Sequence, residues 1–356
     1  MPSLKEIKGR INSISSTLAI TSAMKMVAAA KLQKAQMAIQ NMLPYERRLY
    51  SMLVDLMGAM NISAAASEDG SVRGSGSAER GFDQSGDRLS LSNRHDLAGM
   101  DGAYSLMAQR EVRKVAIVAF ASNSSLCGAF NSNVIREATA VINEYRASGL
   151  GDADITVYSV GRKMAEAMKK LGFPSPADFT KMSDSPSYDA ASALAQELFD
   201  GFVSGRFDKV ELVYNHYKST SSQPTTRQTY LPLSLADATA DIQVGKITGS
   251  ASEPYADKVA EPVVRQNSPT TETPDLIVEP SKEELIATLL PKVVRLRVFT
   301  TLLDSTAAEH AARTVAMQLA TDNGNDLLQE LTLEYNKGRQ QKITSEILDI
   351  VGGSLQ

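Results

Sequence analysis

The sequence is poor in the residues that most often mark a chemical site. Its 356 residues include one cysteine, three histidines and no tryptophan. The single cysteine, Cys127, excludes an internal disulfide or a dithiol switch and fits a reducing compartment. The histidines, which are His95, His216 and His310, lack the spacing of metal ligands. We therefore expect them at ordinary polar positions and predict no metal site.

Neither the charge nor the apolar runs of the chain point to nucleic acid or to a membrane span. The formal net charge is -4, and lysine and arginine are interleaved with aspartate and glutamate, so no basic binding surface is expected. No stretch approaches the roughly 18 apolar residues of a spanning helix. The N-terminus also lacks the apolar core of a signal peptide. We expect a soluble, cytoplasmic protein, and the 43% of hydrophobic residues is enough for a real core.

The sequence also lacks the glycine-rich loops that hold nucleotide phosphates. Neither G-x-G-x-x-G after a strand nor G-x-x-x-x-G-K-[ST] is present. Cys127 follows the first expected strand, where nucleophiles sometimes lie in α/β folds, but no base stands beside it in the sequence. We interpret this segment as a tight turn with a small buried thiol. No catalytic residue and no cofactor are predicted.

What the chain does contain is a long heptad repeat near its N-terminus. Mostly apolar residues follow one another at alternating intervals of four and three, as in a coiled-coil helix. We expect one helix over residues 2–60, about 88 Å long at 1.5 Å per residue, which needs a partner to cover its apolar stripe. The members of this seam are Ile7, Ile11, Ile14, Leu18, Thr21, Lys25, Ala28, Leu32, Ala35, Ile39, Met42, Glu46, Leu49, Leu53 and Leu56.

A second long helix is expected at the other end of the chain, over residues 281–351. Pro280 and Ser281 form a start signal, and Gly352 and Gly353 are expected to end the helix. Its seam weakens in the middle, where Thr306, His310 and Arg313 replace apolar residues; the apolar members are Leu285, Leu289, Leu296, Phe299, Leu303, Leu327, Leu331, Ile343, Ile347 and Ile350. The two helices should lie antiparallel, each covering the other's stripe.

Between the helices lies the only sheet-like part of the sequence. Strands are expected where short, nearly continuous apolar runs occur, and helical patterns alternate with them. This order predicts right-handed crossovers and a small doubly wound domain. The expected strands are Lys114–Phe120, Ile155–Val160 and Val210–Tyr214, with Thr229–Leu235 as an edge strand that tolerates Pro232; the expected helices are Val134–Arg146, Arg162–Leu171 and Ala190–Val203.

The predicted fold class is α/β plus coiled coil, with long antiparallel terminal helices and a central Rossmann-like α/β domain. Two soft stretches, rich in serine, glycine, threonine, proline and charge, separate these parts. The five predicted segments are an N-terminal coiled-coil helix over 1–60, a flexible insert over 61–106, the α/β domain over 107–244, a linker over 245–280 and a C-terminal coiled-coil helix over 281–356.

Polar residues are unusually dense along the last helix, from Thr321 to Glu330 and again from Tyr335 to Lys342. A helix that is polar on nearly every side is either a plain exposed coiled coil or a helix embedded among partners. In the second case its contacts would be specific yet easily broken, as those of a shaft turning inside a collar must be. The polar pattern leaves both interpretations open.

Several motifs in this order resemble the gamma-subunit family of the rotary F-type ATP synthase. The resemblance covers nearly the whole chain except the two soft stretches. The motifs are Ile20 to Lys31 (ITSAMKMVAAAK), Leu126-Cys127-Gly128, Tyr214-Asn215, Glu279-Pro280-Ser281, Glu309 to Arg313 (EHAAR), Leu333 to Gln340 (LEYNKGRQ), Ile343 to Ile347 (ITSEI) and Ile350 to Gly353 (IVGG). The chain departs from the family at Asn123, Ser124 and Ser125, where relatives usually have an acidic residue, a basic residue and glycine.

The resemblance implies a central stalk standing inside an alpha3beta3 hexamer, with the α/β domain at its foot against the epsilon subunit and the c-subunit ring. Met24 and Lys25 match positions that face the moving lever of the beta subunits. Arg339, Gln340 and Thr344 match the shaft's hydrogen-bonding catch with the ring. Contacts at the foot, with epsilon or the c ring, are expected at Leu126, Cys127, Gly128, Tyr214 and Asn215.

By the same resemblance, proton flow turns the c ring, the ring turns this subunit, and the subunit drives the beta-subunit sites through successive states. The chain would be a non-catalytic subunit without cofactor, present once per complex. It would be peripheral to the cytoplasmic face of the bacterial inner membrane. The alternative is a passive coiled-coil scaffold with a non-catalytic α/β domain, which would self-associate through the seam from Ile7 to Leu56.

Overall fold

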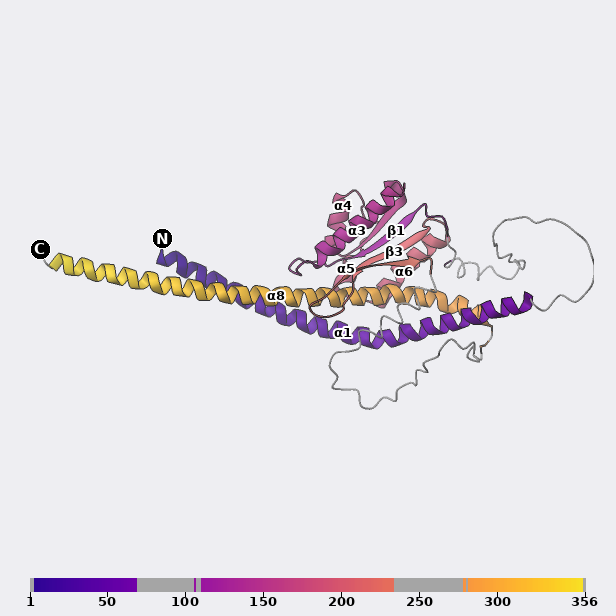
Figure 1. Cartoon of the computed structure of the whole chain (residues 1–356), viewed down its shortest axis with the longest axis horizontal. Helices are drawn as coiled ribbons and strands as arrows, with labels where there is room; N and C mark the ends of the chain where they lie inside the picture. Colours follow the sequence, from indigo (N-terminus) through magenta and orange to yellow (C-terminus); the bar gives the residue numbers. More distant parts are fainter. Residues whose placement is uncertain (1–2, 69–105, 107–109, 234–277, 280, 355–356) are drawn as a thin grey trace, which may run out of the picture.

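Two long helices and one small α/β domain make up the computed structural model, which describes residues 3–68, 106, 110–233, 278–279 and 281–354. Helices α1 (Leu4–Glu68) and α8 (Lys282–Ser354) run antiparallel, and the domain lies against one side of the pair (Figure 1). The expected fold class is therefore confirmed. Most of the expected insert and linker lies outside the described residues.

Helix α1 buries the seam that the heptad pattern predicts. Every one of its members from Ile7 to Leu56 is buried or half-buried, and Ala28, Leu53 and Leu56 are almost completely enclosed. The helix passes through Pro44 and continues beyond Met60 to Glu68, into the segment expected to be an insert. Figure 1 shows that α1 changes direction along its length, as expected of a long helix that contains a proline.

Helix α8 begins where the sequence predicts and ends later. The hydroxyl of Ser281 accepts a hydrogen bond from the backbone N–H of Glu284 at 3.1 Å, so Ser281 caps the helix. The helix then runs through Gly352 and Gly353 to Ser354. The expectation that these glycines end it is wrong, because glycine permits a helix end without imposing one, at a cost of about 1 kcal/mol per residue.

Contacts across the coil report the register in which the two helices lie. Lys25 Nζ donates to Gln318 Oε1 at 2.6 Å, and the hydroxyl of Thr321 donates to that of Thr21 at 3.2 Å. Two glycines of α8 also lie at this contact, where Cβ atoms added to them would come 2.6 Å from Leu18 Cδ2 at Gly324 and 3.1 Å from Leu4 Cδ2 at Gly338. The two helices therefore approach each other closely even where the seam between them is polar.

The upper part of the α8 seam differs from the predicted one. Leu327 is 44% exposed, and its neighbour Leu328 is half-buried instead. The observed members keep the heptad spacing, and three of the seven positions carry small residues; the members are Met317, Thr321, Gly324, Leu328, Leu331, Tyr335 and Gly338. The predicted member Leu331 is buried, but Leu327 was chosen in place of Leu328, because the neighbouring glycine and threonine carry no hydrophobic mark.

The last three predicted seam residues of α8, Ile343, Ile347 and Ile350, are exposed. Helix α1 begins at Leu4, which lies against Gly338, so no part of α1 is available beyond that point. Figure 1 shows the C-terminal end of α8 extending past the N-terminal end of α1. The prediction that these isoleucines pack in the coil is wrong because the two helices differ in where they end.

The sheet has four strands in the order β2-β1-β3-β4. Strand β1 (Val115–Phe120) pairs in parallel with β2 (Ile155–Val160) and β3 (Lys209–Asn215), as expected. The edge strand β4 (Thr225–Leu231) is antiparallel to β3 and begins earlier than predicted. It ends immediately before Pro232, which has no N–H to donate to a ladder.

Helices cover both faces of the sheet. Helices α3 (Phe130–Ala147) and α4 (Arg162–Lys170) pack on one face, against Val115, Ile117 and Ala119 of β1. Helix α6 (Tyr188–Val203) and the coiled coil pack on the other face, against Ala116, Val118 and Phe120. The short elements η1 (Asp152–Asp154) and α5 (Thr180–Asp184) complete the domain. The two terminal helices are thus part of the domain's core.

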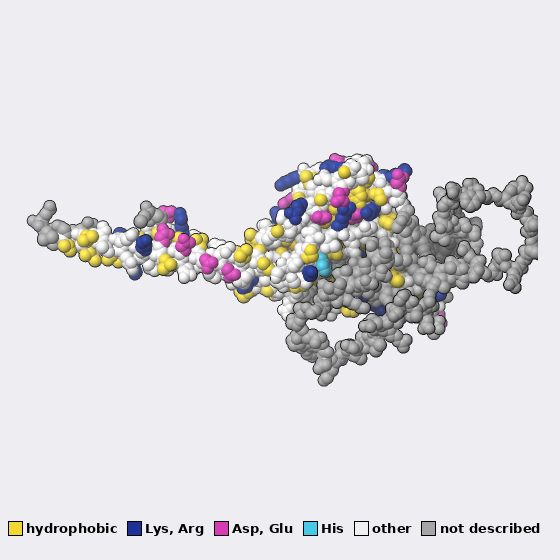
Figure 2. Space-filling model, in the orientation of Figure 1, with side chains coloured by type: hydrophobic (Ala, Val, Ile, Leu, Met, Phe, Trp, Pro, Cys, Tyr) yellow, Lys and Arg dark blue, Asp and Glu magenta, His cyan; other side chains and the backbone are white. Residues whose placement is uncertain are grey.

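Among the described helices, none is both long and apolar enough to cross a bilayer. Exposed apolar side chains gather near the free end of α8, at Ile343, Ile347, Leu348, Ile350 and Val351, and Figure 2 shows apolar side chains at that end.

Candidate functional site

The central feature of the molecule is the junction where α8 crosses the carboxyl ends of β1 and β3. The crossover helices α3 and α6 lie on opposite faces of the sheet, so these strand ends form the switch point at which doubly wound folds bind ligands. Here α8 lies over this edge. The carboxylate of Asp304 accepts a hydrogen bond from the backbone N–H of Tyr217 at 2.9 Å and lies 2.6 Å from His216 Nδ1.

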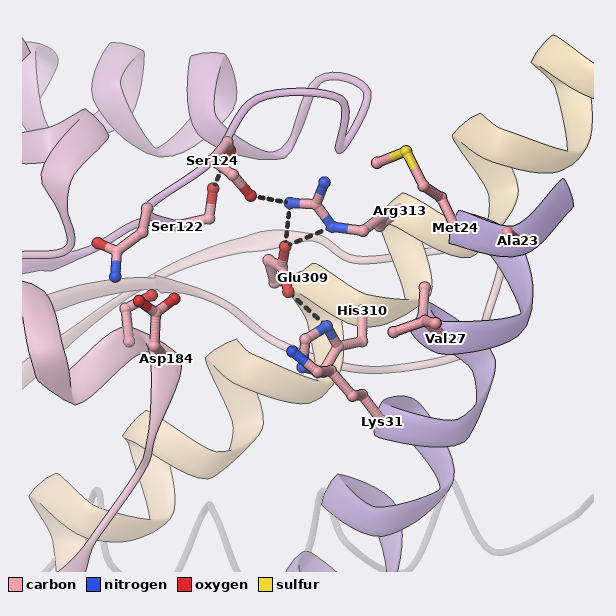
Figure 3. Close-up of a pocket in the computed structure, with 13 residues that line it drawn as sticks. Ala23, Met24, Val27, Lys31, Ser122, Ser124, Asp184, Glu309, His310 and Arg313 are labelled. Atoms are coloured by element: carbon pink, nitrogen blue, oxygen red, sulfur yellow. Dashed lines mark hydrogen bonds and ion pairs between the residues drawn. The ribbon is translucent and has the colours of Figure 1, made fainter. Parts of the chain in front are cut away.

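A second set of contacts, which we call the junction cluster, joins α8 to the loop after β1. It consists of Glu309, Arg313, Ser124 and Ser125. Figure 3 shows Glu309, Arg313 and Ser124. The guanidinium of Arg313 donates to the Ser125 carbonyl and the Ser124 hydroxyl, both at 2.7 Å, and Arg313 Nε donates to Glu309 Oε1 at 2.9 Å. The two side chains are each 11% exposed, so this is a largely enclosed ion pair.

Electrostatics favour the ionised form of Glu309. Burial alone would raise the pKa of this carboxyl group, but His310 and Arg313 more than offset the burial and hold the pKa below its ordinary value. The second carboxylate oxygen lies 2.6 Å from His310 Nδ1. Ser124, through its hydroxyl, and Ser125, through its carbonyl, are thus bound by an arginine of α8. The junction cluster fastens the α/β domain to α8.

A pocket of about 280 Å³ opens beside the junction cluster. Helix α1 gives it an apolar wall, and α8, the loop after β1 and α5 give it a polar wall (Figure 3). The residues that line it are Ala23, Met24, Val27, Ala28, Lys31, Ser122, Asn123, Ser124, Ser183, Asp184, Glu309, His310 and Arg313. No group of metal-ligating side chains occurs within the part of the chain that the structure describes.

The predicted ring contacts fall into two separate groups. Met24 is half-buried and lines the pocket, and Lys25 is bound to Gln318 of α8. Arg339, Gln340 and Thr344 are exposed on the free end of α8, about 33 Å along the helix from Gln318 to Gln340 at 1.5 Å per residue. The structure therefore does not bring the two groups together.

The predicted foot contacts are mostly enclosed within the subunit. Cys127, Tyr214 and Asn215 are buried, whereas Leu126 is 57% exposed and Gly128 is also exposed. Asn215 Nδ2 donates to the Phe130 carbonyl at 3.1 Å, which explains its burial. All five lie at the carboxyl edge of the sheet, the edge nearer the free end of α8. A role of this segment in contacts at the foot stays a prediction.

Sequence reasoning missed Asp304 and the partners of Arg313. The sequence shows the motif from Glu309 to Arg313 but predicts Arg313 only as an interruption of the seam. A detectable mark is the series of polar residues Asp304, Ser305 and Glu309 on the face of α8 that also carries buried leucines. Their partners lie between 87 and 189 residues away in the sequence, so spacing alone does not identify them.

Comparisons with known proteins agree with this architecture. The family model described as ATP synthase matches residues 3–355. The chain is 48% identical over 355 residues to the ATP synthase gamma chain of Phocaeicola vulgatus and 45% identical over 356 residues to that of Bacteroides thetaiotaomicron, covering 100% of both chains in each case.

Among solved structures, the fold is similar to that of a chain in the Euglena gracilis mitochondrial ATP synthase complex of OSCP, F1 and c-ring. The TM-score is 0.54 at 18% sequence identity, and the match covers 99% of this chain and 93% of that one. A chain of the Euglena gracilis ATP synthase rotor gives a TM-score of 0.51 at 18% identity, with coverage of 96% and 98%. These likenesses concern the fold. On its sequence, the chain belongs to the family of ATP synthase gamma chains.

Proposed function

We propose that this chain is the central rotor stalk of an F-type ATP synthase and couples rotation of a c-subunit ring to ATP synthesis and hydrolysis. The observation that carries the proposal is the shape of the shaft. Helix α8 extends as a single exposed helix beyond α1, while its other end is built into the core of the α/β domain. Torque applied to the domain is therefore delivered directly to the free end.

The asymmetry of this shaft supplies the coupling. One rod with an apolar side, a polar side and a lateral domain presents a different surface to each of three sites around it. Its orientation therefore sets which conformation is most stable at each site, and turning it changes all three in sequence.

The chain itself acts without catalysing the ATP reaction, which takes place on the beta subunits. Support comes from the junction, where Asp304 and Arg313 of α8 are bonded to the carboxyl edge of the sheet. That edge is where a doubly wound domain would otherwise hold a ligand. The domain uses its binding edge to hold the shaft.

The partner surfaces follow from the exposed parts of the shaft. Met24, at the pocket, and Lys25 face the beta-subunit lever, and Arg339, Gln340 and Thr344 form the catch with the alpha3beta3 hexamer. The epsilon subunit and the c ring bind the α/β domain at the foot. One copy serves each complex, on the cytoplasmic face of the bacterial inner membrane.

A passive scaffold is not favoured. Such a protein would dimerise through the seam of α1, but α8 of the same chain already covers that seam. The test is affinity purification of the tagged full-length chain from membranes of its host, followed by native mass spectrometry. We expect one copy with a three-plus-three nucleotide-binding ring. A homodimer without that ring would refute the proposal.

A further inference from the structure

A carboxylate is buried in the seam between the two long helices. Glu46 occupies the seam position between Met42 and Leu49 and is 5% exposed. Its Oε1 accepts hydrogen bonds from Arg297 Nη1 at 3.2 Å and from the Thr300 hydroxyl at 3.1 Å, both on α8. A buried charge is stable only when it is paired and hydrogen-bonded, so Arg297 and Thr300 stabilise the carboxylate at this position.

The surrounding seam does not by itself fix how far α1 is displaced along α8. Heptad seams repeat every seven residues, so a shift by one heptad again places mostly apolar side chains against apolar side chains. Glu46 breaks this equivalence. A shift in one direction would place it against Leu290 and in the other against Asp304, where the carboxylate would be unpaired or would face a like charge.

A shift by one heptad is also unfavourable for Arg297, the ion-pair partner of Glu46. Arg297 has a side chain 17% exposed and lies 5.7 Å from the centre of the Tyr50 ring. After a shift by one heptad it would face Ile39 or Leu53. Both members of the pair would then lose their bonds in an enclosed place, which disfavours both shifted registers.

We propose that Glu46 is a positioning residue which, through Arg297 and Thr300, fixes the axial register of α1 on α8. The register decides how far α8 extends beyond Leu4 and places Met24 beside Arg313 at the pocket. Only the consequence for coupling rests on the proposed function. The register itself is a property of the chain.

Disulfide trapping in the full-length chain tests the proposal. The pair Leu18→Cys with Gly324→Cys reports the observed register, because these residues are in contact across the coil. Leu18→Cys with Met317→Cys and Leu18→Cys with Leu331→Cys report shifts by one heptad in either direction. Each pair is made in the parent chain and in the double variant Glu46→Leu with Arg297→Leu, which replaces the ion pair by apolar side chains.

In the parent chain we expect only the pair at residues 18 and 324 to form a disulfide. In the apolar double variant, a shifted pair should rise on the order of a hundredfold relative to the parent, because breaking a buried pair carries a penalty of that size. Exchanging the charges, with Glu46→Arg and Arg297→Glu, should restore the parent pattern. Glu6→Leu is the matched control, since Glu6 is exposed in its ion pair with Arg10.

The proposal is overturned if both shifted pairs stay unlinked in the apolar double variant while the pair at residues 18 and 324 still links. Packing of α1 against the α/β domain would then fix the register. This readout needs no ring subunits, so it is separate from the purification that tests the proposed function.

Discussion

Gly324 allows the two helices of the shaft to approach closely, and replacing it with alanine tests that contact. A Cβ at this position would lie 2.6 Å from Leu18 Cδ2 and 3.2 Å from Leu18 Cγ, so the leucine or one of the helices must move. Gly9, on the exposed face of α1, is the matched control because a Cβ there would meet nothing within 4 Å.

Both substitutions gain the higher helix propensity of alanine, but only Gly324→Ala also overpacks the contact between the helices. Alanine is favoured over glycine in a helix by about 1 kcal/mol, and this gain applies at both positions. Overpacking costs about 1–3 kcal/mol and applies only at Gly324. Gly9→Ala should therefore stabilise the chain by about 1 kcal/mol, whereas Gly324→Ala should be neutral or destabilise it by up to about 2 kcal/mol.

The measurement is urea unfolding of the full-length chain followed by far-ultraviolet circular dichroism, which reports the helices. Adding Leu18→Ala to Gly324→Ala should remove most of the overpacking, and this double-mutant cycle isolates the contact. If Gly9→Ala and Gly324→Ala raise stability equally, α1 and α8 are not in contact at this level and the described register is wrong.

Three further predictions concern the seam, the junction and the ring contact. Leu331→Ala should destabilise the chain by about 2 kcal/mol or more, and Leu327→Ala by less than about 0.5 kcal/mol, in the same urea assay; a loss of about 2 kcal/mol at both positions would restore the seam expected from the sequence, which includes both leucines. The lowered pKa of Glu309 contributes stability that is complete above its ordinary pKa of 4.5 and is lost as the pH falls below that value. Glu309→Gln should therefore flatten the pH dependence of the free energy of unfolding in that range. An unchanged pH profile would contradict this prediction. Met24→Lys should impair coupling while largely keeping ATPase activity, because it adds a positive charge beside Lys25 and Arg313; unchanged ATP-driven proton pumping in membrane vesicles would refute this.

The accuracy of the sequence prediction differs between the two long helices for a physical reason. In α1 almost every seam member has a side chain large enough to be recognised, from Ile7 to Leu56, and the predicted stripe is the buried one. In the upper part of α8 the seam passes through Thr321, Gly324 and Gly338. Those residues allow the helices to approach closely but are not recognised as seam members, so a search for leucine and isoleucine includes the exposed Leu327 there.

The strands were predictable because each is a short apolar run buried on both faces, and β2 agrees with its predicted range at both ends. The position of the edge strand was less well defined, since β4 is mostly half-buried and polar. The partners of the junction could not be predicted. Asp304 and Arg313 bond to backbone groups and to the side chains of His216 and Ser124, which lie in loops far away in the sequence, so neither spacing nor the side-chain pattern identifies these pairs.

The most direct test of the central claim is to watch the chain turn. The ring of the assembled complex would be fixed to a surface through its alpha or beta subunits, and a probe would be attached at Lys170, an exposed residue at the end of α4 on the outer side of the α/β domain. We expect stepwise rotation of the probe in one direction when ATP is added. Continued ATP hydrolysis with a stationary probe would contradict the account.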